Sequence, residues 1–318
     1  MLKEIILFEF AYRRKRPATY LYFLLCVVIG FIFAGTDAVK IVGAGGQLKE
    51  NAPWIIANTL TVINIFLMLV VSAIMGVAVL RDFEHNMEAL LFSTPTSKSD
   101  YLLGRFIGAF LILTFVFLGT IVGMSAGYWY RHFFETENLN QMPFSLWLYF
   151  NPFLILVIPN SILMGTVFFA AGAISRKSLM IYTQGMIMFV LYLISATLLG
   201  EIDNKDIAAL LDPFGSAAFN FQSEYWTPAE KNTLTPQWSG LLLYNRLIWL
   251  GVAGAVWFFL YYFFNFNVVQ DKAGKVKAKL QKTDSEAFAM NIPVVKQDTS
   301  ATSNFGKFWM LTDRKSVV

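Results

Sequence analysis

Six long stretches of this 318-residue chain contain no Asp, Glu, Lys or Arg. Each stretch is at least as long as the roughly 20 residues that an α-helix needs to cross about 30 Å of hydrocarbon. The composition agrees, because 14% of the residues are charged, against about 25% in a typical soluble domain. We therefore predict an all-α integral membrane protein with six transmembrane helices. The predicted spans lie near residues 17–36, 53–80, 103–130, 147–175, 178–200 and 245–268.

The basic residues are divided unevenly among the segments that connect these spans. With the N-terminus inside the cell, the cytoplasmic segments hold 19 of the 25 Lys and Arg residues; these segments are 1–16, 81–105, 176–177 and 271–318. Cytoplasmic segments of membrane proteins carry such an excess. We therefore expect a multi-pass protein of the cell inner (plasma) membrane, with both termini in the cytoplasm and a large external loop at 201–243.

Residues 1–16 have the pattern of a helix that lies in the membrane interface. Apolar residues recur along one side of this segment, and Arg13 to Arg16 form a basic cluster at its end. Cations at this position can lie near anionic lipid headgroups. A basic flank that only sets the topology fits the same residues, so both interpretations stay open.

The polar insert at 81–105 predicts a short amphipathic helix, a break and a second helix. Pro95 has no amide hydrogen to donate and disfavours the α conformation at Thr94, so it should end the first helix. Ser97, with Asp100 three residues later, fits a capping box that opens the next helix. The first helix has an apolar stripe made by Phe83, Met87, Leu90 and Leu91. Such a helix can dock a soluble partner, and a plain surface loop also fits.

This insert resembles the coupling-helix signature of type-2 ABC exporter permeases. The matching residues are Glu84, Leu90, Leu91, Pro95, Leu103, Gly104 and Arg105. The resemblance covers nearly all of residues 1–270 and implies the type-2 ABC exporter fold, with an elbow helix at 1–16 before six transmembrane helices. It implies that segment 81–100 rests in a groove of a separate ATPase. The expected ATPase-contacting residues are Asp82, Glu84, Glu88, Leu91, Thr94 and Pro95.

The resemblance also implies the partners. An ABC ATPase subunit would bind ATP and Mg, while this chain would bind no cofactor itself. A second permease half would complete the path, as a homodimer, a heterodimer or the following half of a longer chain. Three stretches, LDPFGSAAF, YWTPAEKN and NRLIWL, resemble a subgroup whose longer polypeptide joins two permease halves to a zinc aminopeptidase domain. The tail 271–318 would then end in a second elbow helix. Membrane lipid is an expected partner and nucleic acid is not.

Polar and small residues inside the spans suggest two further roles. Candidate lining residues of a substrate path are Asn58, Thr61, Asn64, Asn160 and Gln184, because polar groups in hydrocarbon need a partner or a cavity. Hydrogen bonds between helices are an equally good explanation. A stripe of small residues should let another helix approach the third span closely, and it consists of Gly104, Gly108, Gly119 and Gly123. Pro152 should end an interfacial segment, and Pro159 should kink the fourth span.

The chain carries no motif that indicates an enzyme of its own. It has no G-x-x-x-x-G-K-[ST] loop for ATP phosphates and no H-E-x-x-H zinc motif. The G-x-S-x-G match at 123–127 lies in a predicted span rather than after a strand. We therefore expect a transport subunit, with a non-transporting membrane scaffold for a soluble partner or fused peptidase as the alternative. The absence of Asp, Glu, Lys and Arg from the six long stretches disfavours an ion-coupled carrier.

Overall fold

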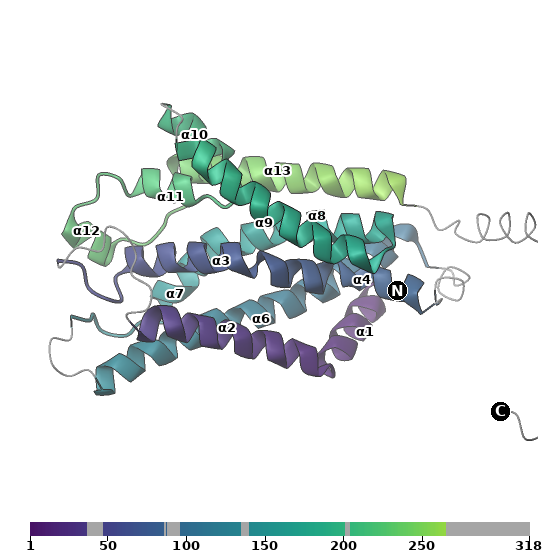
Figure 1. Cartoon of the computed structure of the whole chain (residues 1–318), viewed down its shortest axis with the longest axis horizontal. Helices are drawn as coiled ribbons and strands as arrows, with labels where there is room; N and C mark the ends of the chain where they lie inside the picture. The colour runs from purple at the N-terminus through teal and green to yellow at the C-terminus, as the bar shows by residue number, and fades with distance from the viewer. Residues whose placement is uncertain (37–46, 86, 88–95, 135–139, 201–203, 265–318) are drawn as a thin grey trace, which may run out of the picture. The chain divides into compact units, whose positions relative to one another are not determined.

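The computed structural model describes residues 1–36, 47–85, 87, 96–134, 140–200 and 204–264 (Figure 1). Within these ranges the chain forms helices and connecting turns, with no strand. Helices that are long and apolar enough to cross a membrane are Pro17–Gly35, Pro53–Glu84, Lys98–Phe134, Trp147–Ser175, Leu179–Leu198 and Gly240–Phe263. The predicted all-α protein with six apolar helices is confirmed at this level.

The N-terminal half consists of one short helix followed by three long apolar helices. Its elements are α1 (Leu2–Arg14), α2 (Pro17–Gly35), α3 (Pro53–Met75), α4 (Val77–Glu84) and α6 (Lys98–Phe134). Proline occupies the first helical position of both α2 and α3, where the missing N–H has no intrahelical partner to lose. Helix α4 follows α3 directly at Gly76, so the second apolar helix extends to Glu84. The first residues of the polar insert therefore belong to that helix.

The C-terminal half contains the remaining apolar helices and a group of short ones. Its elements are α7 (Trp147–Pro152), the π-helix η1 (Phe153–Val157), α8 (Ile158–Ser175), α9 (Ser178–Gly200), α10 (Lys205–Leu211), α11 (Ser216–Gln222), α12 (Pro228–Thr233) and α13 (Gly240–Phe263). The prediction that Pro152 ends a segment was wrong, because α7, η1 and α8 follow without a break. The π-helical turn directly after Pro152 takes up the changed hydrogen-bond register that a missing N–H imposes.

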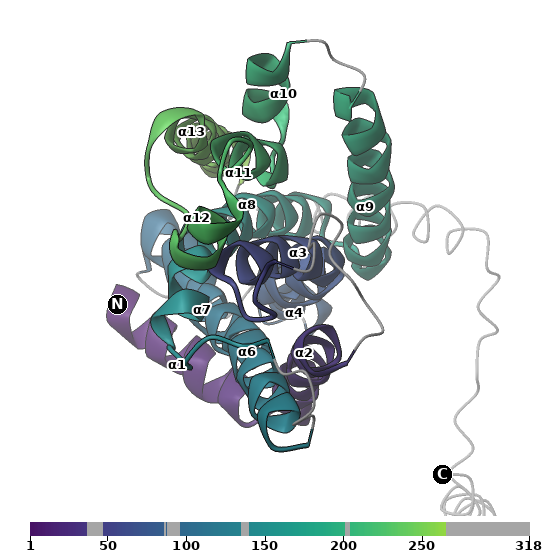
Figure 2. The same cartoon turned by 90° about the vertical axis from the view of Figure 1, so that its left-hand side faces the viewer.

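Helix α3 is the central element of the described part of the chain. It contacts α2, α6, α7, η1, α8 and α9, and Figure 2 shows these helices around it. In the most apolar part of the continuous helix Pro53–Glu84, 67% of the residues are buried. The corresponding values are 11% for α9 and 17% for α13. Most of the apolar surface of α9 and α13 is therefore exposed in this chain.

The glycines of α6 lie where α1 and α2 pack against it. A Cβ added at Gly104 would come within 2.6 Å of Ile5 Cγ2. At Gly119 it would come within 2.7 Å of the Phe23 carbonyl oxygen, and at Gly123 it would meet the backbone of Val27. Because real Cβ atoms do not approach other atoms so closely, only glycine allows these helices their present separation.

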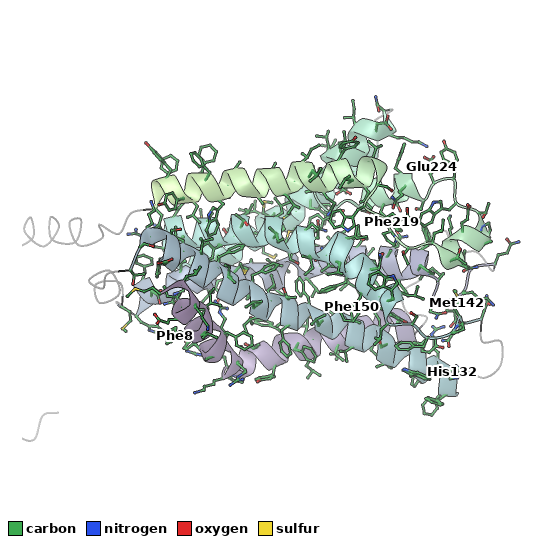
Figure 3. All side chains as sticks on the ribbon, turned by 180° about the vertical axis from the view of Figure 1, so that it is seen from behind. Phe8, His132, Met142, Phe150, Phe219 and Glu224 are labelled. Carbon is green, nitrogen blue, oxygen red and sulfur yellow. The ribbon has the colours of Figure 1, made fainter. Side chains whose placement is uncertain are left out.

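The described helices have two distinct ends. Figure 3 places Phe8 of α1 at one end, and His132, Met142 and Glu224 at the other; we call these the α1 end and the α10 end. The loop at the α10 end contains a capping box, in which Thr227 and Glu230 bond reciprocally at the start of α12.

Candidate functional site

A buried group of charged side chains joins three helices at the α1 end. Its centre is Glu9 of α1, whose side chain is fully buried. The Glu9 carboxylate accepts hydrogen bonds from Arg13 Nε at 2.5 Å, from Arg81 Nη2 at 2.8 Å and from Arg105 Nη1 at 2.5 Å. One carboxylate of α1 therefore holds an arginine of its own helix, one of α4 and one of α6.

Asp82 completes this group from α4. Its carboxylate accepts a hydrogen bond from Arg105 Nη2 at 2.9 Å and another from the Tyr101 hydroxyl at 2.8 Å. Asp82 and Arg105 are 5% and 3% exposed, so the pair is shielded from water. We call Glu9, Arg13, Arg81, Asp82, Tyr101 and Arg105 the ionic cluster.

The three arginines keep Glu9 ionised. Burial alone would raise the pKa of Glu9, but the charges of Arg13, Arg81 and Arg105 favour the carboxylate and bring its pKa down to about 2. The cluster then holds three guanidinium groups against two carboxylates, an excess of one positive charge. Arg13 Nη2 is buried without a hydrogen-bond partner among the described residues. The ionic cluster thus carries one positive charge that its own carboxylates do not balance.

Of the six expected ATPase-contacting residues, the structure describes only Asp82 and Glu84. Asp82 does not face outward, because its carboxylate neutralises Arg105 inside the ionic cluster; a partner cannot use it as a surface contact without breaking that pair. Glu84 is exposed at the end of α4. Ser97 accepts a hydrogen bond from the Asp100 amide at the start of α6, as predicted. The other four, Glu88, Leu91, Thr94 and Pro95, lie outside the described residues.

Three of the four candidate path residues in α3 and α9 donate hydrogen bonds to backbone carbonyl oxygens. Asn58 and Thr61 donate to the carbonyl oxygens of Trp54 and Ala57, one turn earlier in α3. Gln184 of α9 donates to Phe168 of α8 over 3.4 Å, a bond between helices. Asn64 is buried, and its Nδ2 has no partner among the described residues.

Asn160 belongs to a second buried group, at the α10 end. Its Oδ1 accepts a hydrogen bond from Arg246 Nη1 at 2.6 Å, while Asn245 Oδ1 accepts from Nε and Nη2 of the same arginine. Asn160 Nδ2 donates to the Phe214 carbonyl oxygen. We call Asn160, Asn245 and Arg246 the amide cluster. The Arg246 side chain is buried although it lies near the start of α13.

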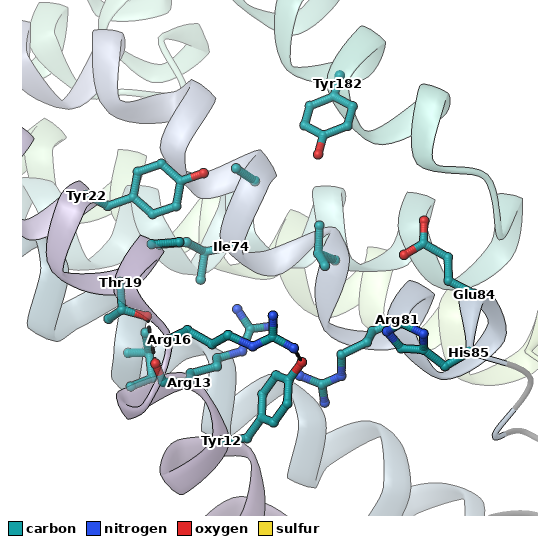
Figure 4. Close-up of a pocket in the computed structure, with 14 residues that line it drawn as sticks. Tyr12, Arg13, Arg16, Thr19, Tyr22, Ile74, Arg81, Glu84, His85 and Tyr182 are labelled. Atoms are coloured by element: carbon teal, nitrogen blue, oxygen red, sulfur yellow. Dashed lines mark hydrogen bonds between the residues drawn. The ribbon is translucent and has the colours of Figure 1, made fainter.

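A pocket of about 310 Å³ lies beside the ionic cluster (Figure 4). Its wall is formed by residues of α1, α2, α3, α4, α6 and α9. The basic residues in this wall are Arg13, Arg16 and Arg81, and tyrosines contribute Tyr12, Tyr22 and Tyr182. Cations with adjacent hydroxyl groups are suited to binding an anion rather than to acid–base chemistry.

Sequence reasoning missed the ionic cluster and this pocket. One local signal existed: Glu9 is the only charged residue between positions 5 and 12, and it lies one helical turn before Arg13. No group of three His, Cys, Asp or Glu residues suited to a metal ion occurs in the part of the chain that the structure describes. The chain matches no protein-family model, and no curated protein matches it.

Proposed function

We propose that this chain is the permease subunit of an ABC transporter, working as an exporter with a second six-helix unit and driven by a separate ATPase. The resemblance of residues 84–105 to the coupling signature and the presence of six apolar helices support this assignment. The location is a cell inner membrane, with segment 81–100 on the cytoplasmic side. ATP and Mg would be bound by the partner, and this chain would act without catalysis.

The observation that carries the proposal is how the two flanks of the coupling segment are joined. The segment leaves α4 after Glu84 and enters α6 at Lys98. The Asp82–Arg105 pair links these helices, with Asp82 near the end of α4 and Arg105 near the start of α6. Glu9 then attaches both helices to α1 through Arg81 and Arg105.

This linkage suggests how a movement could spread. Removing one partner of a buried ion pair costs about 3–5 kcal/mol, so α1, α4 and α6 should move together rather than separately. Helix α2 packs along α6 through the glycine contacts and would follow. A displacement applied to the segment by closure of an ATPase pair would thus reach the first three apolar helices together.

Affinity capture tests the proposal. The tagged chain is purified from its native membrane in parallel with a variant in which residues 84–95 are replaced by a Gly/Ser linker, and bound proteins are identified by mass spectrometry. We expect an ABC ATPase with the unmodified chain and its loss from the variant. Absence of an ATPase from both samples would contradict the proposal and favour the non-transporting scaffold.

A point substitution narrows the contact. Glu84→Lys reverses the charge of an exposed residue at the end of α4, whereas Lys3→Glu changes an exposed residue of α1 as a control. We expect Glu84→Lys to reduce the captured ATPase and Lys3→Glu to leave it unchanged. Equal capture by both variants would remove Glu84 from the contact.

A further inference from the structure

We propose that the pocket beside the ionic cluster binds the phosphate headgroup of an anionic phospholipid. The inference is independent of the transport function proposed above, because it requires only that the chain lies in a membrane. It rests on the charge of the pocket wall, on the directions of its side chains and on the apolar helices beside it.

The wall of the pocket has a surplus of positive charge. Arg13, Arg16 and Arg81 line it, and Glu84 is the one acid among the described lining residues. The Glu9 carboxylate behind the wall is already shared among three arginines. Arg13 is about nine-tenths buried, with Nη2 lacking a partner among the described residues. An anion in the pocket would neutralise charge that the ionic cluster leaves uncompensated.

The guanidinium groups are also arranged for a phosphate. Arg16 and Arg81 both lie over the Tyr12 ring, with Cζ at 4.5 and 4.0 Å from its centroid. Tyr12 thus contacts both guanidinium groups, and its hydroxyl also accepts a hydrogen bond from Arg16. A planar guanidinium can donate two parallel hydrogen bonds to a phosphate. Figure 4 shows the hydroxyl groups of Tyr22 and Tyr182 directed toward the same space. The volume of about 310 Å³ is within the range of roughly 300–1,000 Å³ typical of small-ligand sites.

The surroundings favour a lipid over a soluble phosphate. Thr19 and Tyr22 of α2 and Tyr182 of α9 belong to the pocket wall. Both helices carry exposed apolar side chains beyond it, such as Leu21, which is 63% exposed, and Met186, which is 57% exposed. Acyl chains attached to a headgroup in the pocket could cover such surface, which a free ion would leave bare. The basic end of α1 would hold the headgroup at the membrane surface.

Native mass spectrometry of the detergent-purified full chain tests this proposal. The probes are phosphatidylglycerol, zwitterionic phosphatidylcholine and soluble glycerol 3-phosphate. Arg16→Gln removes an exposed pocket cation that makes no bond to the ionic cluster, and Arg14→Gln removes an exposed cation of α1 outside the pocket. Both variants should therefore fold.

We expect the unmodified chain to prefer phosphatidylglycerol over phosphatidylcholine. Arg16→Gln should bind phosphatidylglycerol roughly tenfold more weakly, the effect of losing one charge-assisted hydrogen bond, and Arg14→Gln should remain within about twofold of the unmodified chain. Equal affinity for both lipids, or equal loss in both variants, would overturn the proposal. Binding of glycerol 3-phosphate as tightly as the lipid would overturn the assignment to a lipid in favour of a soluble phosphate.

Discussion

Arg105 and Arg246 are both buried in apolar helices, but the chain compensates their charges in different ways. Arg105 is bonded to the carboxylates of Glu9 and Asp82, on two other helices. Arg246 is hydrogen-bonded to the side-chain oxygens of Asn160 and Asn245, which are neutral. The buried Asp212 carboxylate also favours the charge of Arg246, although no ion pair joins the two side chains directly. A carboxylate binds an arginine strongly, but removing that carboxylate leaves the buried arginine charge unpaired. A neutral amide forms a weaker hydrogen bond with the arginine. The ionic cluster is therefore suited to joining helices that move together, and the amide cluster to fixing the start of α13 against α8.

The largest difference between the clusters should appear on removal of the central carboxylate. Glu9→Gln leaves Arg13, Arg81 and Arg105 with Asp82 as their remaining cluster anion, and should lower the free energy of unfolding by about 3–5 kcal/mol. The measurement is the thermal unfolding midpoint in detergent, with Glu4→Gln at an exposed position of α1 as control. An unchanged midpoint in Glu9→Gln would contradict the structural role of the cluster.

Acid should weaken the ionic cluster through Glu9. The folded pKa of about 2 lies below the ordinary value of 4.5, so the ionised carboxylate stabilises the fold fully above pH 4.5 and progressively less as the pH falls toward 2. The shift corresponds to roughly 3 kcal/mol. Unfolding midpoints measured from pH 6 to pH 2 should therefore fall more in the unmodified chain than in Glu9→Gln. Parallel pH curves would argue against a depressed pKa.

A substitution in the amide cluster should lower the free energy of unfolding by less than Glu9→Gln does. Asn160→Ala removes the acceptor of Arg246 Nη1 and should cost about 1.5–3 kcal/mol, the value of a hydrogen bond to a charged group. Asn58→Ala is the matched control, because Asn58 bonds to a carbonyl of its own helix. If Asn160→Ala lost more unfolding free energy than Glu9→Gln, the amide cluster would be the more stabilising of the two, contrary to our expectation.

The smallest changes in stability should come from adding one methyl group at a packed glycine and at an exposed one. A Cβ at Gly108 would lie 2.6 Å from Glu9 Cβ, whereas a Cβ at Gly251 of α13 has nothing within 4 Å among the described residues. Gly108→Ala should destabilise by about 1–3 kcal/mol through overpacking. Gly251→Ala should instead stabilise by roughly 0.5–1 kcal/mol, because alanine favours a helix interior. The same unfolding assay decides, and equal midpoints would show that α1 can shift away from α6.

The comparison also shows what sequence reasoning could reach. The six apolar helices follow from the composition of neighbouring residues, and they were predicted. The pairing of Glu9 with Arg105 joins residues 96 positions apart, and Arg246 reaches Asn160 across 86 positions. Charges at the edge of a span look in a sequence like loop residues, so these pairs needed the folded chain. The ATPase contact rests on resemblance and stays a prediction.

ATP turnover by the captured complex tests most directly whether the ionic cluster passes movement from the coupling segment to α1. Complexes of the unmodified chain, Glu9→Gln and Asn160→Ala are purified with equal amounts of ATPase and assayed below their unfolding midpoints. We expect the unmodified chain and Asn160→Ala to change the turnover of the free ATPase to the same extent, and Glu9→Gln to bind the ATPase without changing its turnover. Turnover in Glu9→Gln equal to that of the unmodified complex would contradict the account.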